Sequence, residues 1–62
     1  MMYKAIVYKV ENGRYNELFR RTVFADNTSK CEDIVKTTFT NCKNTTIRLV
    51  NSNYYPVAEF KM

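Results

Sequence analysis

The dipeptide Asn12-Gly13 constrains the fold of this chain more than any other feature of its sequence. It holds the only glycine, and apolar and aromatic residues flank it on both sides. Both residue types accept the positive φ angles that a type I′ turn requires, so the pair is the strongest short-range signal for a tight β-hairpin. We therefore expect residues 2–10 and 15–25 to form two antiparallel strands joined by this turn.

A two-residue loop would set the register of this hairpin, and with it the face on which each side chain lies. One face then carries Val10 with Tyr15, Tyr8 with Glu17, Ile6 with Phe19, and Lys4 with Arg21. The other face carries Val7 with Leu18, Ala5 with Arg20, and Tyr3 with Thr22. A three-residue loop with a glycine bulge would shift this register by one residue.

A helix is expected after the polar segment at 26–29, whose side chains can accept hydrogen bonds from the free N–H groups of a first helical turn. Ser29 followed by Glu32 matches a capping box, and Asn27 or Thr28 could serve instead. An apolar stripe then follows the helical period: Cys31, Ile34, Val35, Thr38, Phe39 and Cys42. Many β-branched residues lower the helix propensity, so we expect this helix to form by packing on a sheet.

The two cysteines are expected to be small core residues rather than a disulfide. On one helix, Cys31 and Cys42 would lie about 16 Å apart, whereas a disulfide needs Cα atoms within about 7 Å. The chain has no histidine and no further cysteine, so a four-ligand zinc site within one chain is not expected. We expect no metal and no cofactor.

Two strands are expected to follow the helix. Residues 45–50 alternate, with Ile47 and Leu49 on one side and Thr46 and Arg48 on the other. Residues 54–62 form the last strand, and Pro56 near its start favours a sheet edge because proline cannot donate to a ladder. The sequence therefore predicts an α+β fold of ββαββ order: one domain over 1–62, with a mainly antiparallel four-stranded sheet and the helix on one face.

Size and composition limit the class of protein. A chain of 62 residues buries little surface, so regular packing or a second copy should support the core. No apolar run is long enough to span a membrane, and the first residues do not resemble a signal peptide. We expect a cytoplasmic protein with reduced thiols.

Catalysis finds no support in the residue types present. There is no histidine to act as a general base, and the single glycine excludes glycine-rich phosphate loops. Ser29 and Ser52, the only serines, fall at a predicted cap and a predicted turn. We therefore expect a protein that is not an enzyme and acts by binding.

The first hairpin is apolar on both of its predicted faces, and one short helix can cover only one of them. We expect the second face to be a contact surface, because monomers rarely expose large apolar patches. The predicted partners are a second copy, paired through this face or the last strand, and an unidentified protein. The candidate contact residues are Tyr3, Val7, Leu18, Arg20, Arg48, Tyr54 and Tyr55.

An alternative function is single-stranded nucleic-acid binding. The net charge is +4, and Lys9, Arg20 and Arg48 are expected to share the uncovered face with Tyr3. No motif of a known family is present. The bias toward Lys, Asn, Tyr and Thr is typical of small proteins from AT-rich bacterial or phage genomes, many of which block a host factor. We therefore favour a stoichiometric protein binder or inhibitor, encoded by a phage or mobile element, over a nucleic-acid-binding protein.

Overall fold

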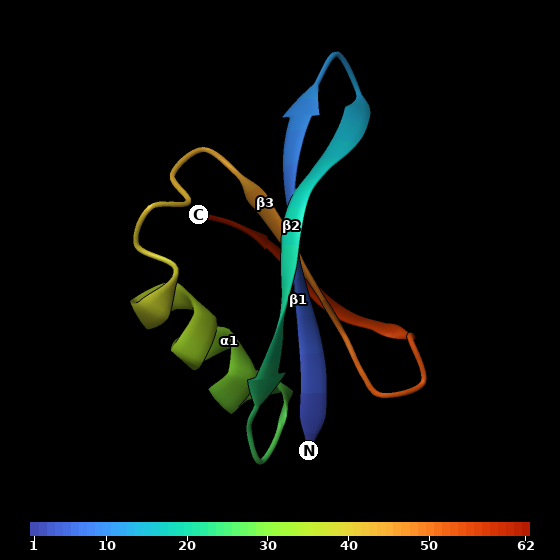
Figure 1. Cartoon of the computed structure of the whole chain (residues 1–62), viewed down its shortest axis with the longest axis vertical. Helices are drawn as coiled ribbons and strands as arrows, with labels where there is room; N and C mark the ends of the chain where they lie inside the picture. The colour runs from blue at the N-terminus through green and yellow to red at the C-terminus, as the bar shows by residue number, and fades with distance from the viewer.

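A computed structural model describes all residues, 1–62, as one four-stranded sheet with a single helix (Figure 1). The elements are β1 (Met2–Glu11), β2 (Arg14–Phe24), α1 (Thr28–Thr38), β3 (Thr46–Val50) and β4 (Pro56–Lys61). The strand order is β2-β1-β3-β4, and every neighbouring pair is antiparallel. The predicted α+β class and ββαββ order are confirmed.

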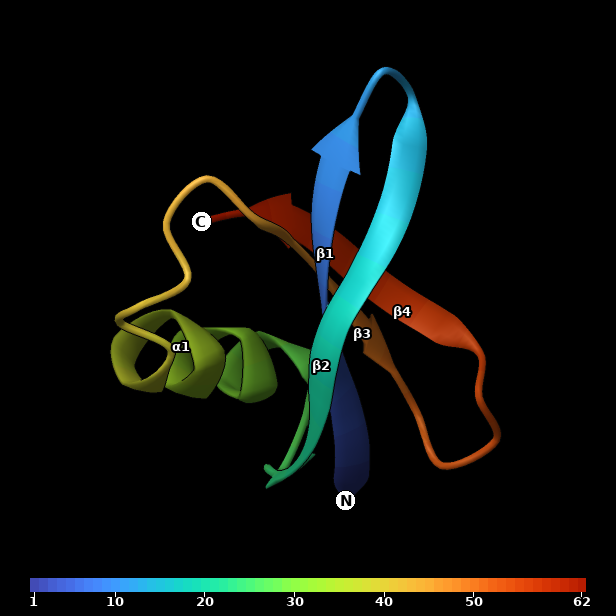
Figure 2. The ribbon, with the colours of Figure 1, turned by 45° about the horizontal axis from the view of Figure 1, so that its top comes forward.

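The turn between β1 and β2 has the predicted backbone conformation. Asn12 and Gly13 have φ angles of 52° and 76°, as a type I′ turn requires. Val10 lies opposite Tyr15 in the expected two-residue register. Because β3 pairs with β1 only as far as Tyr8, the hairpin tip projects beyond the rest of the sheet (Figures 1 and 2). We call the projecting residues 9–16 the hairpin arm.

Below Tyr8 the predicted register is wrong, because β2 contains a β-bulge at Leu18. Tyr8 pairs with Glu17 but Val7 pairs with Phe19, so Leu18 has no partner in β1. Five predicted pairs are corrected: Ile6–Phe19, Lys4–Arg21, Val7–Leu18, Ala5–Arg20 and Tyr3–Thr22. Ile6 instead pairs with Arg20. A residue inserted into one strand exchanges the faces of every side chain that follows it, and alternation alone does not reveal the insertion.

The helix covers the face of the sheet that carries the odd-numbered residues of β1. The buried cluster beneath it contains Tyr3, Ala5, Val7, Val23, Cys31, Val35, Cys42, Ile47 and Leu49. Phe19, moved to this face by the bulge, stacks on Phe39 with ring centroids 6.1 Å apart. The bulge therefore gives the small core an aromatic pair and places Arg20 on the opposite face.

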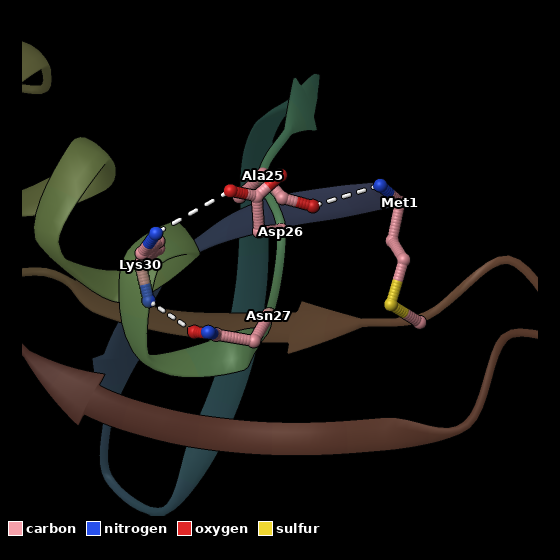
Figure 3. Close-up of polar contacts among 5 residues, drawn as sticks. All are labelled: Met1, Ala25, Asp26, Asn27 and Lys30. Carbon is pink, nitrogen blue, oxygen red and sulfur yellow. Dashed lines mark hydrogen bonds and ion pairs between the residues drawn. The ribbon is translucent and has the colours of Figure 1, made fainter.

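Asn27 begins the helix, as Figure 3 shows. Its extended backbone and its Oδ1, which accepts a hydrogen bond from the Lys30 N–H at 2.9 Å, make it the N-cap. The predicted capping box of Ser29 with Glu32 is not formed, and Asn27, one of the two predicted alternatives, is the cap. Beside the cap, Lys30 Nζ pairs with Asp26 at 3.3 Å, and the Met1 amino group donates to the Ala25 carbonyl at 2.8 Å.

The helix ends at Thr38, earlier than the apolar stripe predicts. The hydroxyls of Thr37 and Thr38 donate to backbone carbonyls of the preceding turn, a competition typical of threonine near a helix end. Cys42 therefore lies in the following loop, although it is still buried, as is Cys31, and both thiols are free. Ile34 is 37% exposed, so it contributes less to the core than the stripe suggests.

β2 and β4 are the two edge strands, and the predicted edge position of Pro56 is confirmed. Each edge strand has one bulge, and each bulge presents an exposed apolar residue: Leu18 in β2 and Val57 in β4. Bulges of this kind twist an edge away from regular pairing. The helix is too short and too polar to cross a membrane.

Candidate interaction surface

The sheet face opposite α1 carries no helix, and we call it the uncovered face. Strand alternation and register place these residues on it: Lys4, Ile6, Tyr8, Val10, Tyr15, Glu17, Arg20, Arg48, Val50 and Glu59. The face is mixed rather than uniformly apolar: charged side chains alternate with apolar and aromatic ones, of which Val10 is 38% and Tyr15 47% exposed. Ile6 is only 6% exposed and Val50 only 4%. Ile6 sits between Arg20 and Arg48 in the register, and the apolar stems of arginines can cover such a residue.

Each of the four strands contributes one side chain to a cluster at the end of this face that adjoins the hairpin arm. We call it the bridging cluster: Tyr8, Tyr15, Arg48 and Glu59. The Tyr15 hydroxyl donates to Glu59 Oε2 at 3.1 Å, and Arg48 donates to Glu59 Oε1 at 3.0 Å. The Arg48 guanidinium lies 5.2 Å from the Tyr8 ring centroid and 5.5 Å from that of Tyr15. The cluster thus fastens the hairpin arm to β4.

The electrostatics of the bridging cluster follow from the Glu59 carboxylate. Its hydrogen bond and its negative charge raise the pKa of the Tyr15 phenol, because both favour the protonated form. The same carboxylate raises the pKa of the Arg48 guanidinium, mainly by accepting its hydrogen bond. Arg48 is therefore a fixed cation that is already paired with a carboxylate.

A second ion pair occupies the middle of the face. Arg20 Nε and Nη2 donate to the two oxygens of Glu17 at 2.9 and 2.6 Å, a bidentate arrangement. The pairing lowers the pKa of Glu17 and raises that of Arg20. The bulge creates this pair, because it puts Glu17 and Arg20 on one face despite their odd spacing.

The β3–β4 turn, residues Asn51–Tyr55, borders the end of the face that lies away from the hairpin arm. We call it the tyrosine turn. Four hydrogen bonds hold it, all of them to Asn51. The Asn51 carbonyl accepts from the Tyr54 N–H at 2.9 Å, and the Asn51 N–H donates to the Tyr55 carbonyl at 3.0 Å. Asn51 Oδ1 accepts from the backbone N–H groups of Asn53 and Tyr55 at 2.9 and 3.1 Å. Asn51 therefore holds the backbone of the turn at both ends.

Tyr54 has a strained backbone. Its φ of 63° lies in the left-handed region, which asparagine and glycine adopt readily but bulky residues rarely do, at a cost of about 1–2 kcal/mol. Its side chain is 60% exposed and that of Tyr55 is 67% exposed. Lys4 Nζ lies 5.4 Å from the Tyr54 ring centroid, and this cation, with a smaller effect from Arg20, lowers the pKa of the Tyr54 phenol.

The structure separates the residues predicted to contact a partner. Arg20 and Arg48 lie on the uncovered face, Tyr54 and Tyr55 lie in the adjoining turn, and Leu18 is exposed on the β2 edge. Tyr3 and Val7 are buried beneath α1 and cannot reach a partner. Their placement on a contact face is corrected, because α1 covers the face that they share.

The predicted position of Lys9 on the uncovered face is also corrected. It alternates with Tyr8 and Val10, so it lies on the opposite side of β1 from Arg20 and Arg48, where it pairs with Glu11 at 3.3 Å. The sequence reasoning also missed the contributions of Lys4, Tyr15 and Glu59 to this surface. The even-numbered pattern of β1 was a signal for Lys4, whereas the contact between Tyr15 and Glu59 joins strands that are not neighbours.

The only acidic side chain in the largest groove of the molecule is already paired. The groove measures about 570 Å³ and lies where the hairpin arm passes β4, beside Val10, Tyr15, Thr46 and Lys61. Its carboxylate, Glu59, is held by Tyr15 and Arg48. The buried Cys31 thiol has a raised pKa because burial disfavours its thiolate. No three metal-ligating side chains come together.

Comparisons of the chain with family models, with curated proteins and with solved structures found no match.

Proposed function

We propose that this protein is a non-enzymatic binding module that attaches to another protein through the uncovered face and the tyrosine turn. The observation that supports this is the internal pairing of both face arginines, Arg20 with Glu17 and Arg48 with Glu59. The result is a surface of tyrosines and held arginines, and both residue types are enriched at interface hot spots. Rigid side chains of this kind lose little entropy on binding.

The same pairing disfavours single-stranded nucleic acid as the ligand. Binding to a phosphate backbone requires cations that are free to neutralise phosphates and displace their counterions, whereas both face arginines already neutralise carboxylates. Arg48 lies over the rings of Tyr8 and Tyr15, so these rings are less accessible to stacked bases. Glu17 and Glu59 would also repel a phosphate backbone.

The module would act by stoichiometric occupation of its partner's surface, in the manner of a phage-encoded inhibitor working in the cytoplasm. Small size and the Lys, Asn, Tyr and Thr bias support this origin. The chain can also be expected to form a homodimer. With Ile6 and Val50 covered, the basis for self-association moves from the face to the last strand, β4, whose outer edge has no partner strand.

The test is capture from a nuclease-treated bacterial lysate with the immobilised protein and two matched variants. Arg20→Ala removes a cation from an exposed ion pair on the uncovered face, and Lys30→Ala does the same on the helix side. We expect a protein to be captured in stoichiometric amount, with capture reduced by Arg20→Ala and unchanged by Lys30→Ala. A protein that is captured from untreated lysate but not from nuclease-treated lysate, or equal effects of the two variants, would contradict the proposal.

A further inference from the structure

The charges left outside ion pairs are almost all positive. Five of the six acidic side chains pair with five of the ten basic ones. The one acidic side chain outside these pairs is Asp33, on the helix, whereas five cations remain: Lys4, Arg14, Arg21, Lys43 and Lys61. Lys4 is the member of this set that lies against an exposed aromatic ring, that of Tyr54.

The tyrosine turn combines three features that stability does not explain. It presents two consecutive, largely exposed aromatic rings. It holds Tyr54 in a left-handed conformation that asparagine would adopt with less strain. Its hydrogen bonds, all made by Asn51, hold the backbone from which both rings project. Strain at an exposed, over-determined position is characteristic of binding sites, where it keeps a group ready for contact.

The turn also lies apart from the helix and from the hairpin arm, on the far side of the sheet from α1 (Figure 1). A partner can therefore approach it without contacting the helix. The nearest charged groups are Lys4 and Arg20, and Arg20 is held by Glu17. The local field is positive, and a partner surface of opposite sign fits it.

We propose that the tyrosine turn is the anchor of the interface, and that the partner is a protein with an acidic patch. This inference rests on the proposed function. The two phenol rings would enter apolar depressions of that patch, and Lys4 would pair with a carboxylate beside them. A nucleic acid fits less well, because Lys4 alone would offer a free cation here and Glu17 stands beside Arg20.

Tyr54→Asn separates a binding role from a structural one. Asparagine tolerates a positive φ, so we expect this variant to melt at the same temperature as the wild type or a few degrees higher. A clear fall in the melting temperature would show that Tyr54 is held for stability and would overturn the proposal. Asn12 and Asn44, which adopt similar φ angles, show that this fold accepts asparagine in such turns.

The binding probe is a peptide of alternating glutamate and leucine, about twenty residues long, titrated into ¹⁵N-labelled protein. We expect shifts at residues 51–55 and at Lys4, and an affinity about tenfold weaker in Tyr54→Asn and in Lys4→Glu. Lys43→Glu is the control for charge, since it makes the same charge change at an exposed lysine that is also outside the ion pairs, whereas Lys4 is half-buried, and it should change the affinity less than about twofold.

Three results would overturn the inference: no binding of the peptide, equal loss in Lys43→Glu, or tighter binding of an oligothymidylate of similar length with the same dependence on Tyr54. The lysate experiment distinguishes this failure from failure of the proposed function. If a protein is captured through Arg20 but capture survives both Tyr54→Asn and Lys4→Glu, only the anchor and the acidic partner are wrong. If no protein is captured, the proposed function itself is wrong.

Discussion

Tyr15 and Glu59 lie on the two opposite edge strands of the sheet, yet the Tyr15 hydroxyl donates a hydrogen bond to the Glu59 carboxylate across 3.1 Å. A flat sheet would keep these strands too far apart, since neighbouring strands are spaced by about 4.8 Å. The sheet therefore curls toward its uncovered face, and the hairpin arm bends over β4. This curl makes Glu59 the common partner of Tyr15 and Arg48.

Tyr15→Phe should loosen the hairpin arm without unfolding the protein. The ring remains to pack on Tyr8, 5.5 Å between centroids, but the bond to Glu59 is lost. We expect amide exchange in residues 9–16 to become faster by up to about fivefold, with no change in α1. Hydrogen exchange followed by NMR measures this. Tyr55→Phe is the control, because it removes an exposed hydroxyl, and identical exchange in the two variants would contradict the bridging role.

The pKa values of the Tyr15 and Tyr54 phenols should lie on opposite sides of the ordinary value of 10.0, with that of Tyr15 raised and that of Tyr54 lowered. For Tyr15 the folded state favours the neutral phenol, so its contribution to stability is present below that value and is lost as pH rises through the raised pKa. For Tyr54, Lys4 favours the phenolate, so the folded state gains relative stability as pH rises through the lowered pKa. NMR titration of the tyrosine rings gives both values.

A Lys4→Met variant provides the control for this titration. The pKa of Tyr54 should return toward its ordinary value while that of Tyr15 stays raised, because Glu59 is untouched. If Tyr54 titrates after Tyr15 in the wild-type protein, the assignment of their neighbouring charges is wrong.

Adjacent helix residues offer a test of the packing. Val35→Ala removes two buried methyl groups and should lower the free energy of unfolding by about 2–3 kcal/mol, from lost transfer energy and a cavity. Ile34→Ala removes more atoms from a side chain that is 37% exposed, and should cost less than about 1.5 kcal/mol. Urea denaturation compares them, and a larger effect at Ile34 would mean that α1 is rotated about its axis.

Self-association can be located with the two bulge residues of the edge strands. A charge on an edge opposes pairing with another strand. If β4 forms the dimer, Val57→Lys should halve the mass measured by sedimentation equilibrium, while Leu18→Lys, the equivalent change in β2, should leave it unchanged. The opposite pattern would assign the dimer to β2, and a single-chain mass for the wild-type protein would contradict the homodimer altogether.

Local chemistry made much of this fold predictable. Asn12-Gly13 favours a tight turn through its own backbone preferences. Asn27 belongs to a residue type that is preferred at helix N-caps. The alternation around Ile47 and Leu49 assigns one face of β3 to the core. These signals act over a few residues, so the sequence contains them directly. The edge position of Pro56 followed from the same reasoning, whereas the spatial strand order β2-β1-β3-β4 was not predicted.

The surface was less predictable because it depends on a single inserted residue. Leu18 carries no signature of a bulge, yet the bulge moves Phe19 into the core and Arg20 onto the uncovered face. A register without the bulge puts Phe19 on the face of Ile6 and Tyr8, which favours that face as the core and leaves Tyr3 and Val7 on the exposed side. The position of Ile6 between two arginines also depends on the pairing of strands distant in sequence, which periodicity does not report.

The most direct test of partner binding is the amide exchange of this protein, free and in complex with the protein that it captures from nuclease-treated lysate. The uncovered face and the tyrosine turn are proposed to be the contact surface, so exchange should slow at residues 51–55 and in β1 and β2, while α1 (Thr28–Thr38) remains unchanged. Protection confined to α1, with residues 51–55 exchanging as fast as in the free protein, would contradict the proposal.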